Sequence, residues 1–390
     1  MNDTLINEAD LLARLKKANI PLVNPVHTAY IPTASFVFNR MTGGGLPERC
    51  ITQFWGAESV GKTLLAQNFV GMLTRGEFDP ETGEVTRRGR VAWVDAEGAF
   101  DPSWAMQCGI DLKYLDLVQP LSGEEALNVV TTLARQTHQV GKQTLPVYRM
   151  IVLDSIASLA YRAEIEGEAD DAHVALAARK ISAWIRPLRQ NILRVTGTTV
   201  LIINQMRMKI GGSPRADPRE MPGGFALKHD TDLTVAFNGI ERFPKDDDQE
   251  AVAYRLHLKT RKNRTFCSGL ACQVIVRVDD HPGIDLAAEL APLALDYGLI
   301  TNAQGQPRKN GHCYLDGRLL MYSPKPGLPE QPVGSEAALK DLLYQDPALR
   351  RTIEARVFAA MQQEVELRRA SWSAGESMVL PESVDAEEEA

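Results

Sequence analysis

A segment of eight residues carries the glycine and lysine spacing of a phosphate-binding loop. Residues 56–63 fit the pattern G-x-x-x-x-G-K-[ST] and lie between an apolar run and a helical pattern from Leu64 to Met72. Glycines here let backbone N–H groups surround phosphate oxygens, while Lys62 brings a cation and Thr63 offers a hydroxyl to Mg²⁺. The alternative is a glycine turn with a surface lysine. The residues expected to contact a nucleotide, ATP or GTP, are Gly56, Ala57, Glu58, Ser59, Val60, Gly61, Lys62 and Thr63.

Two apolar runs end on acids, as a magnesium nucleotide site requires. The run 150–153 is followed by Asp154, which we expect to hold Mg²⁺ through water. The run 91–94 is followed by Asp95 and then by Glu97. Glu97 is the better candidate to orient an attacking water, because hydrolysis depends on positioning and charge stabilisation. Either Asp95 or Glu97 could instead cap a helix.

A third apolar run, residues 199–203, ends in the amides Asn204 and Gln205. The carboxyl ends of neighbouring parallel strands meet at one edge of a sheet, where ligands bind. The Gln205 amide could therefore hydrogen-bond a γ-phosphate and report its presence. The alternative is a polar strand end whose hydrogen bonds are satisfied within the fold.

Positive charge gathers in two stretches. Residues 255–264 contain no acid, and their cations are Arg255, Lys259, Arg261, Lys262 and Arg264. Residues 206–224 are rich in Gly and Pro and carry Arg207 and Lys209, the composition of a loop that becomes ordered on binding. Met208 and Phe225 could insert between nucleic-acid bases, or they could pack in the core.

A helical pattern from Leu176 to Leu193 carries a polar stripe. The polar residues at helical spacing are Arg179, Ser182 and Arg186. The apolar residues that can face a sheet are Ile181, Ile185 and Leu188. The stripe could contact phosphates, or it could be a solvated helix face. The preceding stretch, 164–171, holds five acids, so we expect shape or backbone contacts from it and not charge attraction.

An α/β framework is needed to bring these residues together. From Cys50 to about Val278, apolar runs alternate with helical patterns, and several runs are apolar on both faces, as in a mainly parallel sheet covered by helices. The predicted strands are 50–55, 91–95, 114–118, 150–154, 199–204 and 232–237. The predicted units are a helix and leader segment at 1–49, a core at 50–280, a small domain at 281–372 and a disordered acidic tail at 373–390.

Composition limits the class of protein. The 390 residues are 44% hydrophobic and 24% charged, which excludes a wholly disordered or collagen-like chain. Lys and Arg number 43 and Asp and Glu 50, giving a net charge of −7, so a polyanion-binding surface must be local. Five scattered cysteines favour free thiols, and we see neither a signal-peptide pattern nor a membrane span. We therefore expect a cytoplasmic protein without membrane contact.

Several ordered blocks resemble the RecA family of ATP-dependent DNA recombinases, over roughly residues 32–285. The blocks in the family's order are 56–63, 95–97, 101–102, 154–155, 163–168, 176–179, 203–211 and 223–228. The resemblance implies a RecA-type P-loop NTPase core with a mainly parallel central sheet, a short N-terminal segment and a small α/β C-terminal domain. The length and the C-terminal region resemble phage recombinases, so a phage origin, with the host cytoplasm as location, is a hypothesis.

The resemblance also implies catalytic roles. Glu97 is the implied catalytic glutamate, beside the phosphate-binding Lys62. Gln205 is the implied link from the γ-phosphate to the family's second DNA loop, which residues 206–224 resemble. Lys262 and Arg264 would reach the ATP of a neighbouring subunit in a filament, and direct DNA contact by the same two residues is the alternative.

The implied cofactors are ATP and Mg²⁺. Thr63 and Asp154 would hold Mg²⁺ through water, and Asp101 and Trp104 fall where the family contacts adenine. Tryptophan replaces the family's usual tyrosine there and keeps a stacking face. The implied DNA-binding residues are Val174, Arg179, Ser182, Arg186, Arg207, Met208, Lys209, Gly223, Gly224 and Phe225. Phe225 stands where the family usually has asparagine.

The implied function is that of a DNA-dependent ATPase that forms a helical filament on single-stranded DNA and catalyses homologous pairing and strand exchange. Implied partners are single-stranded and double-stranded DNA, further copies of the chain, and single-strand-binding and mediator proteins. The alternatives are a RecA-fold hexameric helicase or another non-recombinase ATPase. A P-loop kinase is a further alternative, but we recognise neither its acceptor pocket nor its lid arginines.

Overall fold

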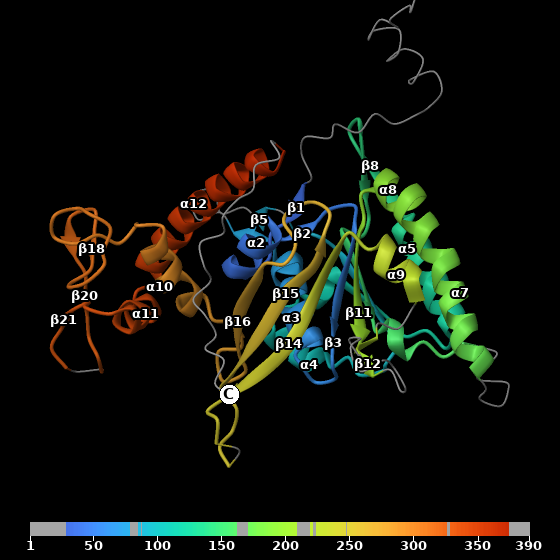
Figure 1. Cartoon of the computed structure of the whole chain (residues 1–390), viewed down its shortest axis with the longest axis horizontal. Helices are drawn as coiled ribbons and strands as arrows, with labels where there is room; N and C mark the ends of the chain where they lie inside the picture. Colours follow the sequence, from blue (N-terminus) through green and yellow to red (C-terminus); the bar gives the residue numbers. More distant parts are fainter. Residues whose placement is uncertain are drawn as a thin grey trace, which may run out of the picture.

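The computed structural model describes residues 29–78, 85–86, 88–161, 171–208, 219–220, 224–246, 248–325 and 328–373. Its largest element is a nine-stranded sheet with helices on both faces (Figure 1). In spatial order the strands are β17 (Gly283–Ile284), β16 (Ala271–Arg277), β15 (Ala253–Asn263), β14 (Leu233–Phe243), β3 (Ile51–Gly56), β11 (Thr199–Gln205), β10 (Met150–Asp154), β6 (Val91–Asp95) and β7 (Leu115–Val118).

Six neighbouring strands, from β14 to β7, run parallel, and β15, β16 and β17 continue the sheet in antiparallel pairings. The α/β class with a mainly parallel central sheet is thereby confirmed. The six predicted strands are all present, and five of them match within one residue at each end. β14 runs on to Phe243 because it pairs with β15 as far as Ala253, a strand that the apolar patterns did not reveal.

Helices cover both faces of the sheet. They are α2 (Phe36–Thr42), α3 (Lys62–Arg75), α4 (Pro102–Gln107), α5 (Gly123–Ala134), α7 (Asp171–Pro187), α8 (Arg194–Thr196) and α9 (Gly224–Asp230), with a π-helical turn at Leu188–Leu193 between α7 and α8. Alternate strand residues point into two cores, because side chains alternate along a strand. Trp93 packs with Phe69 of α3 on one face, and Ala92 packs with Leu127 of α5 on the other.

A separate hydrophobic cluster forms in the C-terminal part. Its helices are α10 (Leu286–Asp296), α11 (Glu336–Gln345) and α12 (Pro347–Ser373). α11 and α12 are separate helices because Pro347 opens α12, and proline is well suited to the first turn of a helix. Short hairpins join β18 (Tyr314–Leu315) to β19 (Arg318–Leu319) and β20 (Met321–Tyr322) to β21 (Gln331–Pro332).

The carboxylate of Glu289 on α10 links this cluster to the N-terminal part. It accepts hydrogen bonds from Ser35 Oγ at 2.7 Å and from the Phe36 backbone N–H at 2.7 Å, at the start of α2. Burial raises the pKa of Glu289 to about 8. The predicted boundary at residue 281 stays a prediction.

Smaller elements complete the described chain. They are β1 (Tyr30–Ile31), β2 (Leu46–Pro47), β4 (Glu77–Phe78), β5 (Val85–Thr86), β8 (Thr137–Val140), β9 (Gln143–Pro146), β12 (Arg207–Met208), β13 (Arg219–Glu220), and the 3₁₀ turns η1 (Leu112–Tyr114) and η2 (Ile156–Ser158). Residues 1–28 of the predicted helix and leader segment, and the residues of the predicted tail after 373, lie outside the described residues. Within the described part, no helix is both long enough and apolar enough to cross a membrane.

Candidate functional site

The loop between β3 and α3 has glycines where side chains would not fit. Gly61 has a φ of 84°, and a Cβ atom there would lie 2.6 Å from Leu256 Cδ2. A Cβ atom on Gly56 would lie 2.7 Å from the carbonyl oxygen of Phe237. The loop therefore lies in close contact with β14 and β15. Lys62 begins α3 and donates to the Gly56 carbonyl at 3.2 Å and to the Ala57 carbonyl.

This loop borders a cavity of about 470 Å³ at the carboxyl edge of the parallel strands. The lining residues are Glu58, Ser59, Gly61, Lys62, Thr63, Leu64, Glu97, Asp154, Ile203, Gln205, Ile240 and Tyr254. The candidate residues from four separate chain segments thus meet in one place. Ile240 and Tyr254 were missed by the sequence patterns, because only the pairing of β14 with β15 brings these residues to the loop.

Asp154 lies at the base of the cavity. Its Oδ2 accepts a hydrogen bond from Thr63 Oγ1 at 3.0 Å, whereas its buried Oδ1 has no partner in the part of the chain that the structure describes. Burial, with a contribution from the charge of Glu97, raises the pKa of Asp154 to about 7. An unpaired buried carboxylate oxygen beside a threonine hydroxyl fits a magnesium ion bound through water.

Glu97 is held by three donors. Its Oε1 accepts hydrogen bonds from Ser155 Oγ at 2.6 Å, Ser158 Oγ at 2.8 Å and Gln205 Nε2 at 3.0 Å. Neither serine was given a role from the sequence, although Ser155 directly follows Asp154 in one of the recognised blocks. The geometry places Glu97 and Gln205 in direct contact, with the glutamate oriented by the chain that follows β10.

Asp95 has a structural role here. Its Oδ1 accepts from the Gly98 N–H at 2.9 Å, and its Oδ2 accepts from the Phe100 N–H at 3.1 Å and from Gln119 Nε2 at 3.0 Å. These bonds close the turn after β6. Of the two acids on this run, Glu97 alone lines the cavity.

Asp101 and Trp104 lie on α4. Asp101 is the N-cap of this helix and accepts from the N–H groups of Ser103 at 2.7 Å and Trp104 at 3.3 Å. Neither residue is among those that line the cavity. Their contact with adenine stays a prediction.

The candidate DNA-facing stripe lies on α7. Arg179 and Arg186 are exposed, and Ser182 Oγ donates to the Ala178 carbonyl at 2.6 Å. The three apolar residues expected to face the sheet are buried: Ile181, Ile185 and Leu188. α7 packs against α9, and Arg186 approaches Asp230 at the end of α9 to 3.9 Å.

The structure places the other candidate DNA contacts only in part. Val174 lies in α7, Arg207 and Met208 form β12, and Gly224 and Phe225 begin α9. Lys209 and Gly223 lie outside the described residues.

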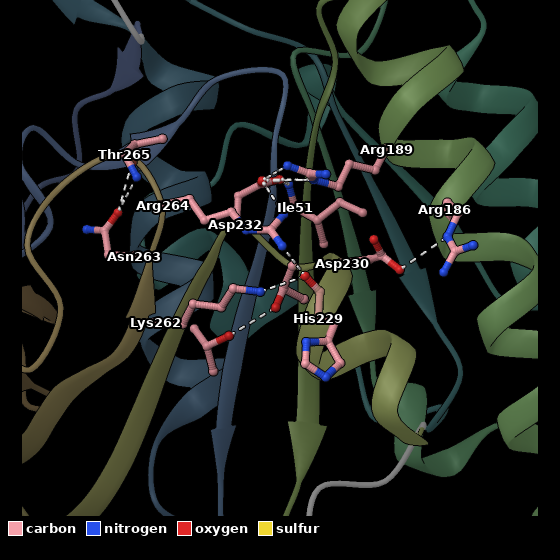
Figure 2. Close-up of polar contacts among 12 residues, drawn as sticks. Ile51, Arg186, Arg189, His229, Asp230, Asp232, Lys262, Asn263, Arg264 and Thr265 are labelled. Atoms are coloured by element: carbon pink, nitrogen blue, oxygen red, sulfur yellow. Dashed lines mark hydrogen bonds and ion pairs between the residues drawn. The ribbon is translucent and has the colours of Figure 1, made fainter.

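Lys262 and Arg264 meet the carboxyl end of α9 (Figure 2). Lys262 Nζ donates to the carbonyls of Lys228 at 2.9 Å and His229 at 2.6 Å, and Arg264 donates to the His229 carbonyl at 2.5 Å. Cations stabilise this end of a helix, where the carbonyls are unpaired. Burial is the main cause that lowers the pKa of Lys262 to about 8, and the positive charge of Arg264 is the second cause.

These two cations lie at the opposite edge of the sheet from the phosphate loop. Gly56, at the loop, pairs with Phe237 of β14, whereas Lys262 pairs with Thr234, near the start of the same strand. They do not line the cavity of their own chain. Their contact with the ATP of a neighbouring subunit stays a prediction.

Asp232, directly before β14, ties three segments together (Figure 2). Its carboxylate accepts from Arg189 Nη2 at 2.5 Å and from the Ile51 N–H at 3.1 Å, and it lies 3.6 Å from Arg264 Nη1. The sequence patterns missed Asp232 and Arg189, because these side chains meet only when β14 packs beside the π-helical turn that follows α7.

Comparisons with known proteins agree with this geometry. A family model described as the RecA N-terminal domain matches residues 18–273. "Protein RecA" of Chlorobaculum tepidum is 33% identical over 337 residues, which is 85% of this chain and 84% of the relative. "Protein RecA" of Acidothermus cellulolyticus is 34% identical over 288 residues, 73% of each chain. "Protein RecA" of Tropheryma whipplei is 33% identical over 308 residues, 77% of this chain and 62% of that relative.

Proposed function

The chain belongs to the RecA family of recombination and repair ATPases, and from this premise we propose that its cavity hydrolyses ATP when the protein is bound to single-stranded DNA. The observation that carries the proposal is the convergence of Lys62, Glu97 and Asp154 on one cavity of about 470 Å³. A phosphate loop, a candidate magnesium ligand and a glutamate that can orient water are the parts that phosphoryl transfer to water requires.

The phosphates are held by the chain between β3 and α3. Backbone N–H groups of residues 57–62 surround the phosphate oxygens, and Lys62 exchanges the Gly56 and Ala57 carbonyls for them. Thr63 and Asp154 would hold Mg²⁺ through water, and the ion would neutralise phosphate charge. ATP and Mg²⁺ are accordingly the proposed cofactors, with Asp101 and Trp104 on the adenine side.

Glu97 orients the attacking water, and Gln205 reports the γ-phosphate. The Gln205 amide donates to Glu97 at 3.0 Å in this structure. A γ-phosphate in the cavity competes for that amide, because a phosphate oxygen is a strong charged acceptor. Gln205 is the last residue of β11, and the second DNA loop follows it in the sequence. Movement of the Gln205 side chain is therefore transmitted toward DNA.

Lys262 and Arg264 act on the ATP of a neighbouring subunit. Their place at the far edge of the sheet makes the contact heterologous, since each subunit uses one edge to offer cations and the other to offer phosphates. Contacts of this type that do not close on themselves give an open helical filament. Direct contact of the same two residues with DNA remains the second reading.

DNA binding and filament formation are implied by family membership. We propose that α7, β12 and the start of α9 contact single-stranded DNA, and that the filament then pairs with homologous duplex DNA and exchanges strands. Single-strand-binding and mediator proteins are proposed partners. The free cysteines and the family favour a cytoplasmic location. A hexameric helicase is not favoured by the family match.

Electron microscopy with a strand-exchange assay tests this function. Protein mixed with single-stranded DNA and a slowly hydrolysed ATP analogue is expected to form open filaments that pair with homologous duplex DNA. Lys262→Ala/Arg264→Ala protein is the matched comparison and is expected to remain in short or dispersed particles. Closed rings that translocate on DNA and exchange no strands would contradict the proposal.

A further inference from the structure

Three hydrogen-bond donors converge on one oxygen of Glu97. The two hydroxyls, of Ser155 and Ser158, also lie 2.8 Å from each other. Within the described residues, the recorded hydrogen bonds of the Glu97 side chain all go to Oε1. Among the described residues no hydrogen bond to the second oxygen, Oε2, is found, and Glu97 is one of the residues that line the cavity.

The donors are attached to different elements. Ser155 and Ser158 belong to the turn after β10, which is fixed by the buried side chains of Ile156 and Leu159 in the core beneath α5 and α7. Gln205 ends β11 and lines the nucleotide cavity. When Gln205 turns to a γ-phosphate, only the two serines continue to hold Glu97.

Counting protons shows what each serine contributes. Each hydroxyl carries one hydrogen, so two hydrogens serve the three contacts among Ser155, Ser158 and Glu97. Either both serines donate to Glu97, or one donates to the other and only one reaches the carboxylate. Where both serines donate to Glu97, removing the Ser158 hydroxyl costs the glutamate one support and leaves it the hydrogen bond from Ser155.

We propose that Ser158 is a positioning residue for Glu97, which keeps the glutamate aimed at the attacking water once Gln205 has moved to the phosphate. The inference rests on the proposed ATPase function. Ser158 touches neither nucleotide nor DNA in this account, and it acts through the Glu97 carboxylate. Its partly buried side chain and its place on a fixed turn suit that role.

Steady-state ATP hydrolysis in the presence of single-stranded DNA tests the inference. Ser158→Ala is expected to lower kcat about five-fold, a factor that corresponds to about 1 kcal/mol, because one of the hydrogen bonds that hold the Glu97 carboxylate is lost while the others remain. KM for ATP and the affinity for single-stranded DNA are expected to change less than about two-fold, because no substrate contact is lost. Ser158→Thr retains the hydroxyl and is expected to restore most of kcat.

A double-mutant comparison separates action through Glu97 from a structural effect. In a Glu97→Ala background, Ser158→Ala is expected to have no further effect on kcat, since the group that it positions is absent. A kcat for Ser158→Ala equal to that of the parent would overturn the inference, and so would a full five-fold fall in the Glu97→Ala background. A thermal unfolding midpoint within about 2 °C of the parent confirms that the variant is folded.

The same experiment distinguishes failure of the proposed ATPase function from failure of the Ser158 inference. A parent protein with no DNA-stimulated hydrolysis would contradict the proposed function, and the role of Ser158 would fall with it. A parent that hydrolyses ATP and a Ser158→Ala variant that matches it would contradict the Ser158 inference alone.

Discussion

The guanidinium of Arg189 and the carboxylate of Asp232 form a bidentate ion pair, with Nη2 to Oδ1 at 2.5 Å and Nε to Oδ2 at 3.0 Å. The pair is well shielded from water, since the side chains of Asp232 and Arg189 are 5% and 15% exposed. The pair joins the π-helical turn that follows α7 to the start of β14. The candidate DNA-facing helix and β14 are thereby fixed to each other, and the same Asp232 carboxylate lies 3.6 Å from Arg264 Nη1.

Asp232→Ala is expected to lower the free energy of unfolding by about 3–5 kcal/mol, because it leaves the Arg189 guanidinium without its partner in a site shielded from water. Asp232→Asn keeps an acceptor and is expected to cost less. Asp316→Asn is the matched control, since its pair with Arg356 is on the surface and contributes little to stability. Denaturant unfolding measures all three. Equal losses at the two positions would show that the Arg189 pair is not structural.

Lys62→Ala and Glu97→Gln are expected to fail in different ways. The first removes the cation that meets the phosphates, so nucleotide affinity and hydrolysis both fall. The second is expected to bind ATP and DNA normally and to turn over about 10²–10³-fold more slowly, because only the alignment of the attacking water is lost. Nucleotide-binding titrations and steady-state rates separate the two. Parental hydrolysis by Glu97→Gln would remove the catalytic assignment.

Replacing Lys262 and Arg264 together by Ala is expected to leave ATP affinity of the isolated subunit unchanged and to abolish DNA-stimulated hydrolysis. The reason is that their phosphate target belongs to the next subunit. Lys142→Ala, an exposed cation in the turn between β8 and β9, serves as control for the change in charge. The combination to be measured is fluorescent-nucleotide affinity and the stimulated rate. Normal stimulated hydrolysis in the double variant would exclude the role in a neighbouring site.

The stability of the protein is expected to depend on pH through Glu289. Burial raises its pKa from 4.5 to about 8, so its contribution is complete below pH 4.5 and is lost as the pH rises through 8. Glu289→Gln does not titrate. The free energy of unfolding of the parent, relative to Glu289→Gln, is expected to fall by up to a few kcal/mol between pH 5 and about 8.5. A constant difference across that range would show that Glu289 is ionised throughout.

The elements around the nucleotide were largely predictable from local pattern. The strands β10, β6 and β11 are continuous apolar runs that end in Asp154, Asp95 and Gln205. The loop at 56–63 has a fixed glycine spacing. Such signals lie within one short segment, so a single sequence suffices to detect them.

Features made by segments far apart in the chain were not predictable. β15 was noticed only as a basic run, because its buried residues alternate with cations that face solvent. The Arg189–Asp232 pair joins residues separated by 43 positions, and the Tyr254 side of the cavity depends on strand register. Ser158 looked like an ordinary polar residue in a turn until its hydroxyl was found beside Glu97.

The most direct test of the account is the rate of ATP hydrolysis by the full chain, with Mg²⁺, in the absence and the presence of single-stranded DNA. If the cavity at residues 56–63 serves a recombinase of this family, the rate is expected to rise at least about ten-fold when single-stranded DNA is added. The same low rate in both conditions, measured with protein that binds both ATP and DNA, would contradict it.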